Sequence, residues 1–176
     1  GKLAMNRLTV SVMSNLGLLK FAEENGIEID ETNVGDRYVI ESMRKTGSVL
    51  GGESSGHMIF AEHSTTGDGI LSGLQVVKLL GESEMSMSEL AKTVKLYPQV
   101  LANARVKNEN KSIYLNDEEV KTKLSEIEER IKDEGRILIR PSGTEALVRI
   151  MIEGKDEAKI ESYANELAEL IEGKFA

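Results

Sequence analysis

The sequence predicts an α/β unit over the first half of the chain, followed by a small α+β domain. In the first half, short β-branched segments alternate with segments of helical periodicity, which is typical of layered α/β folds. In the second half, two adjoining strand patterns are joined by a short turn and flanked by helical patterns. The pattern changes around Pro98, so we expect one domain over 1–97 and another over 98–176.

The elements of the first half follow from the spacing of apolar residues. We expect strands over 8–13, 28–34 and 57–61, and helices over 15–24, 36–45 and 70–79. Asn25-Gly26 and Gly47 are suited to end the first two helices, and Asp36 to cap the second. The third helix is amphipathic, and Thr66 or Asp68 is expected to cap it.

The second half predicts one sheet covered by two helices. Strands are expected over 100–106, 136–140 and 146–152, the last two joined by the five-residue turn 141–145. Asn116 and Glu119 resemble a capping box that opens the first helix. Ile160, Leu167 and their neighbours at helical spacing predict the second helix.

Composition excludes several classes of protein. The chain has 176 residues, of which 40% are hydrophobic, with 22 basic and 30 acidic side chains and a net charge of −8, which argues against nucleic-acid or membrane-surface partners. There is no cysteine, which excludes disulfides, thiolate metal sites and a cysteine nucleophile. No apolar run approaches the ~20 residues that span a bilayer, and no signal-peptide pattern opens the chain, so we expect a cytoplasmic protein.

The segment Gly51-Gly52-Glu53-Ser54-Ser55-Gly56-His57 combines glycines with polar side chains. If the segment is extended, Glu53, Ser55 and His57 point the same way, and a carboxylate, a hydroxyl and an imidazole suit the hydroxyl groups of a sugar. The alternative is a solvated loop that leads into a strand.

The segment Arg140-Pro-Ser-Gly-Thr-Glu145 predicts a turn rich in hydrogen-bond donors. Backbone N–H groups, the hydroxyls of Ser142 and Thr144, and the guanidinium groups of Arg140 and Arg149 suit a phosphate dianion. The alternative is an ordinary hairpin turn whose arginines pair with nearby acids.

The segment 64–69 is read as a helix cap. His63 is expected on the surface, and Glu62 and Asp68 do not make a metal site by spacing. The sequence predicts no metal site.

Taken in order, these segments resemble the α-D-phosphohexomutase superfamily. The motifs are Gly-Gly-Glu-Ser-Ser-Gly-His at 51–57, Thr-Thr-Gly-Asp-Gly at 65–69 and Arg-Pro-Ser-Gly-Thr-Glu at 140–145. Val-Met-Ser-Asn-Leu-Gly at 12–17 and Val-Gly-Asp-Arg-Tyr-Val at 34–39 narrow the resemblance to the bacterial phosphoglucosamine mutases. The resemblance spans nearly the whole chain.

The resemblance implies that the chain is a C-terminal fragment. It would comprise an N-terminally incomplete three-layer α/β/α domain 3, followed by the small domain 4 with a TBP-like antiparallel sheet and two helices. The family's phosphoserine loop, Ser-His-Asn-Pro, and its magnesium loop, Asp-Gly-Asp-x-Asp-Arg, are absent from the sequence. We therefore expect the Mg²⁺ ligands on the missing N-terminal domains and no mutase activity in this chain alone.

The resemblance also implies the activity and the residue roles. The parent would interconvert glucosamine 6-phosphate and glucosamine 1-phosphate through a phosphoserine and a bisphosphate, with glucose or glucosamine 1,6-bisphosphate as activator, for UDP-N-acetylglucosamine and peptidoglycan synthesis. It is expected to act as an isomerase, with a homodimer possible. The roles assigned are sugar binding by Glu53 and Ser55, a place near the reacting oxygen for His57, and phosphate binding by Arg140, Ser142, Gly143, Thr144 and Arg149.

Two kinds of alternative stay open from the sequence. The chain could belong to a related phosphomannomutase or phosphoglucomutase, because loops of this kind also suit glucose and mannose phosphates. It could instead be a free-standing phosphosugar-binding module, or a dimerisation or regulatory piece.

Overall fold

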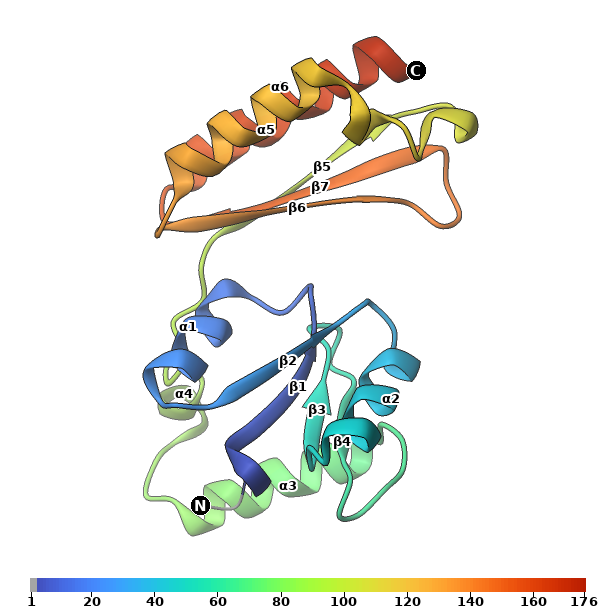
Figure 1. Ribbon diagram of the computed structural model, residues 1–176. Coiled ribbons are helices and arrows are strands. Elements are labelled where there is room, and N and C mark those ends of the chain that lie inside the picture. Colours follow the sequence, from blue (N-terminus) through green and yellow to red (C-terminus); the bar gives the residue numbers. More distant parts are fainter. Residues whose placement is uncertain (1–2) are drawn as a thin grey trace. The chain divides into compact units, whose positions relative to one another are not determined.

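The computed structural model describes residues 3–176, which form two compact units that divide between Leu96 and Tyr97 (Figure 1). No helix among these residues is both long enough and apolar enough to cross a membrane.

The first unit is built on a four-stranded sheet. Its strands are β1 (Arg7–Ser11), β2 (Glu28–Thr32), β3 (Leu50–Gly52) and β4 (Met58–Phe60), in the order β2-β1-β3-β4. Strand β1 is parallel to β2 and β3, and β4 is antiparallel to β3. The three strands predicted from periodicity are confirmed with shorter bounds. The sequence missed β3, because its two glycines indicated a loop.

The helices of this unit begin and end at recognisable residues. They are α1 (Leu16–Glu24), α2 (Asp36–Thr46), α3 (Gly69–Glu82) and the short α4 (Met87–Leu90), which was not predicted; a 3₁₀ turn spans Ala4–Asn6. Helix α2 ends at Gly47, whose φ of 78° is left-handed. Asp68 caps α3 by accepting the N–H groups of Ile70 and Leu71. The prediction that Asp36 caps α2 is wrong: Gly35 is the N-cap and Asp36 is the first helical residue.

The strand order places α1 and α2 on opposite faces of the sheet. The chain passes from β1 outward to β2 through α1, and then back across β1 to β3 through α2. Parallel crossovers are right-handed, so two crossovers in opposite directions lie on opposite faces, as Figure 1 shows. The core beneath α2 consists of Val39, Met43 and Ile59.

The apolar face of α3 is not buried in this structure. The spacing predicts an amphipathic helix, and the helix is present, but Ile70 is 81% exposed, and Leu74, Val77 and Leu79 are also exposed. The sequence thus identified the helix correctly without showing what covers it.

The second unit has a three-stranded antiparallel sheet with two helices on one face (Figure 1). The strands β5 (Gln99–Arg105), β6 (Gly135–Pro141) and β7 (Leu147–Gly154) lie in the order β5-β7-β6, and the helices are α5 (Glu118–Ile131) and α6 (Glu157–Phe175). Short 3₁₀ turns span Asn108–Asn110 and Tyr114–Asn116. The predicted α+β arrangement is confirmed. The predicted cap is wrong by one residue, because Asp117 rather than Asn116 accepts the first N–H groups of α5.

The two faces of this sheet differ in character. Val148, Ile150 and Ile152 of β7 point into a core with both helices, which includes the buried Ile127 and Leu167. Since side chains alternate along a strand, Arg140 of β6 and Arg149 of β7 belong to the opposite face. This register places both arginines beside the turn that joins β6 and β7.

Candidate functional site

The loop 53–57 is a tight hairpin connection between β3 and β4. The N–H of Glu53 donates to the carbonyl of His57 at 2.9 Å, and the N–H of Gly56 donates to the carbonyl of Glu53 at 3.1 Å. Gly56 has a φ of 91°, which a residue without Cβ adopts without strain. The expectation that Glu53, Ser55 and His57 alternate along an extended segment is therefore wrong, because the chain turns back between them.

One oxygen of the Glu53 carboxylate accepts a hydrogen bond from Gly35, the N-cap residue of α2. Its Oε1 accepts the N–H of Gly35 at 2.9 Å, which joins the Gly-Gly-Glu loop to the Val-Gly-Asp-Arg segment. The other oxygen, Oε2, has no hydrogen-bond partner among residues 3–176. Sequence reasoning missed this bond, because the two residues lie 18 positions apart and no local pattern connects them.

The imidazole of His57 rests directly on the backbone of Gly67. A Cβ added at Gly67 would overlap the Cδ2 and Nε2 atoms of the ring, so only glycine leaves room for this contact. The structure thereby brings together the 51–57 and 65–69 motifs. Ser55 is exposed at the tip of the hairpin, and His63 is exposed, as expected.

The turn 142–146 is held by hydrogen bonds of Ser142 and by one bond from Val106, the residue that follows β5. Ser142 donates its N–H to the carbonyl of Leu147 at 2.9 Å, and its Oγ accepts the N–H of Glu145 at 3.1 Å. Val106 donates to the carbonyl of Ala146 at 3.1 Å. Ser142 is 4% exposed, and its hydroxyl oxygen accepts a hydrogen bond within the turn. Its hydroxyl proton can still donate one further bond.

Gly143 and Thr144 form the open part of this turn. Both are exposed, and neither the N–H groups nor the Thr144 hydroxyl makes a hydrogen bond to another residue of the range 3–176. The turn therefore presents donors that no described residue uses, and a nest of such donors suits an anion.

Two arginines lie opposite one another where β6 and β7 enter the turn. Arg140 and Arg149 are direct cross-strand neighbours. Residues paired in this way have Cβ atoms about 5 Å apart, which is unfavourable when both side chains carry the same charge. Arg149 forms an ion pair with Glu145 at 2.7 Å. Arg140 is half-buried and forms no ion pair or hydrogen bond to any described residue. The hairpin interpretation thus holds for Arg149 but leaves the Arg140 guanidinium unexplained.

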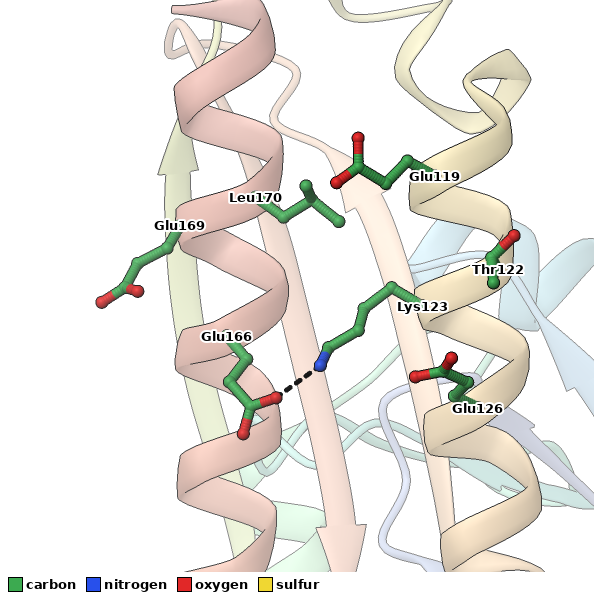
Figure 2. A pocket seen from close by; sticks show the side chains of 7 residues that line it. All are labelled: Glu119, Thr122, Lys123, Glu126, Glu166, Glu169 and Leu170. Atoms are coloured by element: carbon green, nitrogen blue, oxygen red, sulfur yellow. Dashed lines mark hydrogen bonds and ion pairs between the residues drawn. The ribbon is translucent and has the colours of Figure 1, made fainter.

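A groove between α5 and α6 has the opposite charge character (Figure 2). It has a volume of about 400 Å³ and is lined by four glutamates, Thr122, Lys123 and Leu170. Lys123 forms an ion pair with Glu166 at 2.5 Å, and this bond lowers the pKa of the Glu166 carboxyl below its ordinary value. The groove holds none of the predicted site residues, and its surplus of carboxylates disfavours a phosphate.

The described residues do not fit a divalent metal. No group of three or more histidine, aspartate or glutamate side chains within residues 3–176 lies close enough together to hold a metal ion.

Two family models match successive parts of the chain and define its class. A family model described as phosphoglucomutase/phosphomannomutase, alpha/beta/alpha domain III, matches residues 1–97, and one described as the C-terminal domain of the same family matches residues 101–170. The chain belongs to the phosphoglucomutase/phosphomannomutase family.

Curated relatives place the chain close to one branch of that family. It is 56% identical over 175 residues to a phosphoglucosamine mutase of Acetivibrio thermocellus and 52% identical over 175 residues to one of Clostridioides difficile. Each alignment covers 99% of this chain and 39% of the relative, so the chain spans about two fifths of their length.

Solved structures share the fold at low sequence identity. An Aspergillus fumigatus N-acetylphosphoglucosamine mutase in complex with GlcNAc-6P and magnesium has a TM-score of 0.81 at 18% identity, over 99% of this chain and 40% of that one. A variant of the fungal enzyme in complex with glucose 1,6-bisphosphate has a TM-score of 0.80 at 18% identity, over 97% of this chain and 39% of that one.

The contact between His57 and Gly67 gives a prediction about the His57 ring. Gly67→Ala should displace the imidazole, because the added methyl group occupies the space of the ring. The ring signals of His57 in a histidine-selective NMR spectrum should shift. Gly69→Ala is the matched control, because a Cβ at that position meets nothing within 4 Å. Unchanged His57 signals in Gly67→Ala would contradict this packing.

Proposed function

We propose that this chain is the C-terminal, substrate-binding part of a phosphoglucosamine mutase. The complete enzyme would interconvert glucosamine 6-phosphate and glucosamine 1-phosphate in the cytoplasm, for UDP-N-acetylglucosamine and peptidoglycan synthesis. The observation that carries the proposal for this chain is the unpaired Arg140 guanidinium, directly across from Arg149 and beside the open donors of the turn.

Phosphate binding is assigned to the turn of the second unit. Arg140 can donate two charge-assisted hydrogen bonds to one phosphate, and the N–H groups of Gly143 and Thr144 can add two more. Ser142 would donate its remaining hydroxyl proton. A dianion between Arg140 and Arg149 offsets the repulsion between the two cations, and it competes with Glu145 for Arg149.

Sugar binding is assigned to the hairpin of the first unit. The free Oε2 of Glu53 accepts hydrogen bonds from sugar hydroxyls, while the exposed Ser55 hydroxyl both donates and accepts them. His57 is the residue proposed near the reacting oxygen, and its ring has a fixed position on Gly67. Sugar and phosphate are then held by separate groups, as reorientation of a bisphosphate intermediate requires.

Two parts of the reaction are proposed to lie outside this chain. The phosphoserine loop has no counterpart in the sequence, and the described residues offer no ligand set for Mg²⁺. A bound Mg²⁺ would stabilise charge during phosphoryl transfer, and we assign its ligands to other segments of the complete enzyme. The residues of this chain bind and orient the substrate.

The phosphate assignment can be tested on the chain itself. Titration with inorganic phosphate should shift the amide signals of Ser142, Gly143 and Thr144, with a Kd of about millimolar because the free anion gains nothing from the sugar-binding hairpin. Arg140→Ala should abolish these shifts, and added salt should weaken binding, since the site is exposed to screening.

Arg130→Ala is the matched control for this titration. It removes one arginine from the exposed surface of α5, where Arg130 lies 4.0 Å from Glu126. Its titration should follow that of the unmodified chain. Shifts that spread over the surface, or that persist in Arg140→Ala, would sink the phosphate assignment.

The sugar assignment requires the complete enzyme. Glu53→Gln should keep the fold but lower turnover by about tenfold or more, because an amide oxygen accepts hydrogen bonds less strongly than a carboxylate. Turnover is measured as formation of glucosamine 1-phosphate. Ser54→Ala, at an exposed neighbouring position, should leave turnover unchanged. If Glu53→Gln is as active as the unmodified enzyme, Glu53 serves only the start of α2.

A further inference from the structure

A lysine outside the recognised motifs contacts the turn 142–146, to which phosphate binding is assigned. The Nζ of Lys111 donates to the carbonyl oxygen of Ser142 at 3.0 Å, in a partly buried contact between residues 31 positions apart. Lys111 follows the 3₁₀ turn Asn108–Asn110, which lies between β5 and α5. Neither the motif comparison nor the periodicity of the sequence pointed to it.

The segment that carries Lys111 is fixed at the end of α6. The backbone N–H of Lys107 and the side-chain amide of Asn110 both donate to the carbonyl oxygen of Phe175, at 2.9 and 3.1 Å. Lys111 therefore approaches Ser142 from an anchored segment rather than from a free loop.

The Ser142 carbonyl that accepts the Lys111 bond belongs to the same peptide group as the Gly143 N–H, which is proposed to bind the phosphate. The carbonyl of Ser142 and the N–H of Gly143 form one planar trans unit, so the two groups point in opposite directions. Fixing the carbonyl toward Lys111 fixes the Gly143 N–H away from it. Gly143 is exposed, and a Cβ there would meet nothing within 4 Å, so no packed side chain holds the peptide on the Gly143 side.

We propose that Lys111 is a positioning residue for phosphate binding, which locks the Ser142–Gly143 peptide with its N–H directed at the anion. The ammonium group also polarises the peptide, which makes the N–H a stronger donor. The inference rests on the proposed phosphate function of the turn and extends it to a residue on a different segment. It assigns Lys111 no direct contact with the substrate.

The experiment is the phosphate titration of the chain, followed at the Gly143 amide. Lys111→Met keeps the aliphatic stem and removes the donor, and should raise the Kd by about five- to tenfold. Lys111→Arg restores a cationic donor and should recover most of the affinity. Lys107→Met is the matched control: it removes an exposed lysine from the same segment without touching Ser142, and should bind as the unmodified chain does.

Each outcome decides the inference. If the unmodified chain shows no Arg140-dependent shifts at the turn, the proposed phosphate function fails and the role of Lys111 fails with it. If the unmodified chain binds phosphate and Lys111→Met binds equally well, only the role of Lys111 is overturned. Equal weakening in Lys107→Met, or no recovery in Lys111→Arg, also overturns it, because net charge or altered packing then explains the loss. Should Lys111→Met unfold, Lys111→Gln is measured in its place with the same expectation.

Discussion

The proposed anion site of the second unit depends on two like charges placed directly opposite one another. The antiparallel register of β6 and β7 makes Arg140 and Arg149 direct neighbours, and only Arg149 has an acidic partner within residues 3–176. A protein gains no stability from such a pair on its own. The core lies on the other face of the sheet, and Lys111 bonds to the turn beside the two arginines. We propose that a bound dianion completes this arrangement.

The first unit reaches its geometry through glycine at two positions. Gly56 adopts the left-handed φ that closes the hairpin, and Gly67 leaves the space that the His57 ring occupies. The polar residues of this hairpin therefore owe their positions to backbone shape rather than to the alternation of an extended strand.

Local patterns in the sequence were sufficient for most of the fold. Alternation and helical spacing located β1, β2, α2 and the antiparallel sheet of the second unit, because these signals extend over five or more residues. Caps were placed less well, since Gly35 and Asp117 each compete with a neighbour of similar propensity.

The contacts that shape the candidate site were not predictable in this way. Glu53 bonds to Gly35 and Lys111 bonds to Ser142 across 18 and 31 positions, and each bond depends on how the elements pack. The motifs could point to the candidate loops, but not to the side chains that hold those loops.

The most direct test of the account is a crystal structure of the chain grown with glucosamine 6-phosphate. We expect the phosphate group within about 2.7–3.1 Å of the Arg140 guanidinium and the Gly143 N–H, with Arg149 turned from Glu145 toward the anion. A structure in which the turn is accessible to solvent but empty, with the phosphate bound elsewhere on the chain, would contradict it.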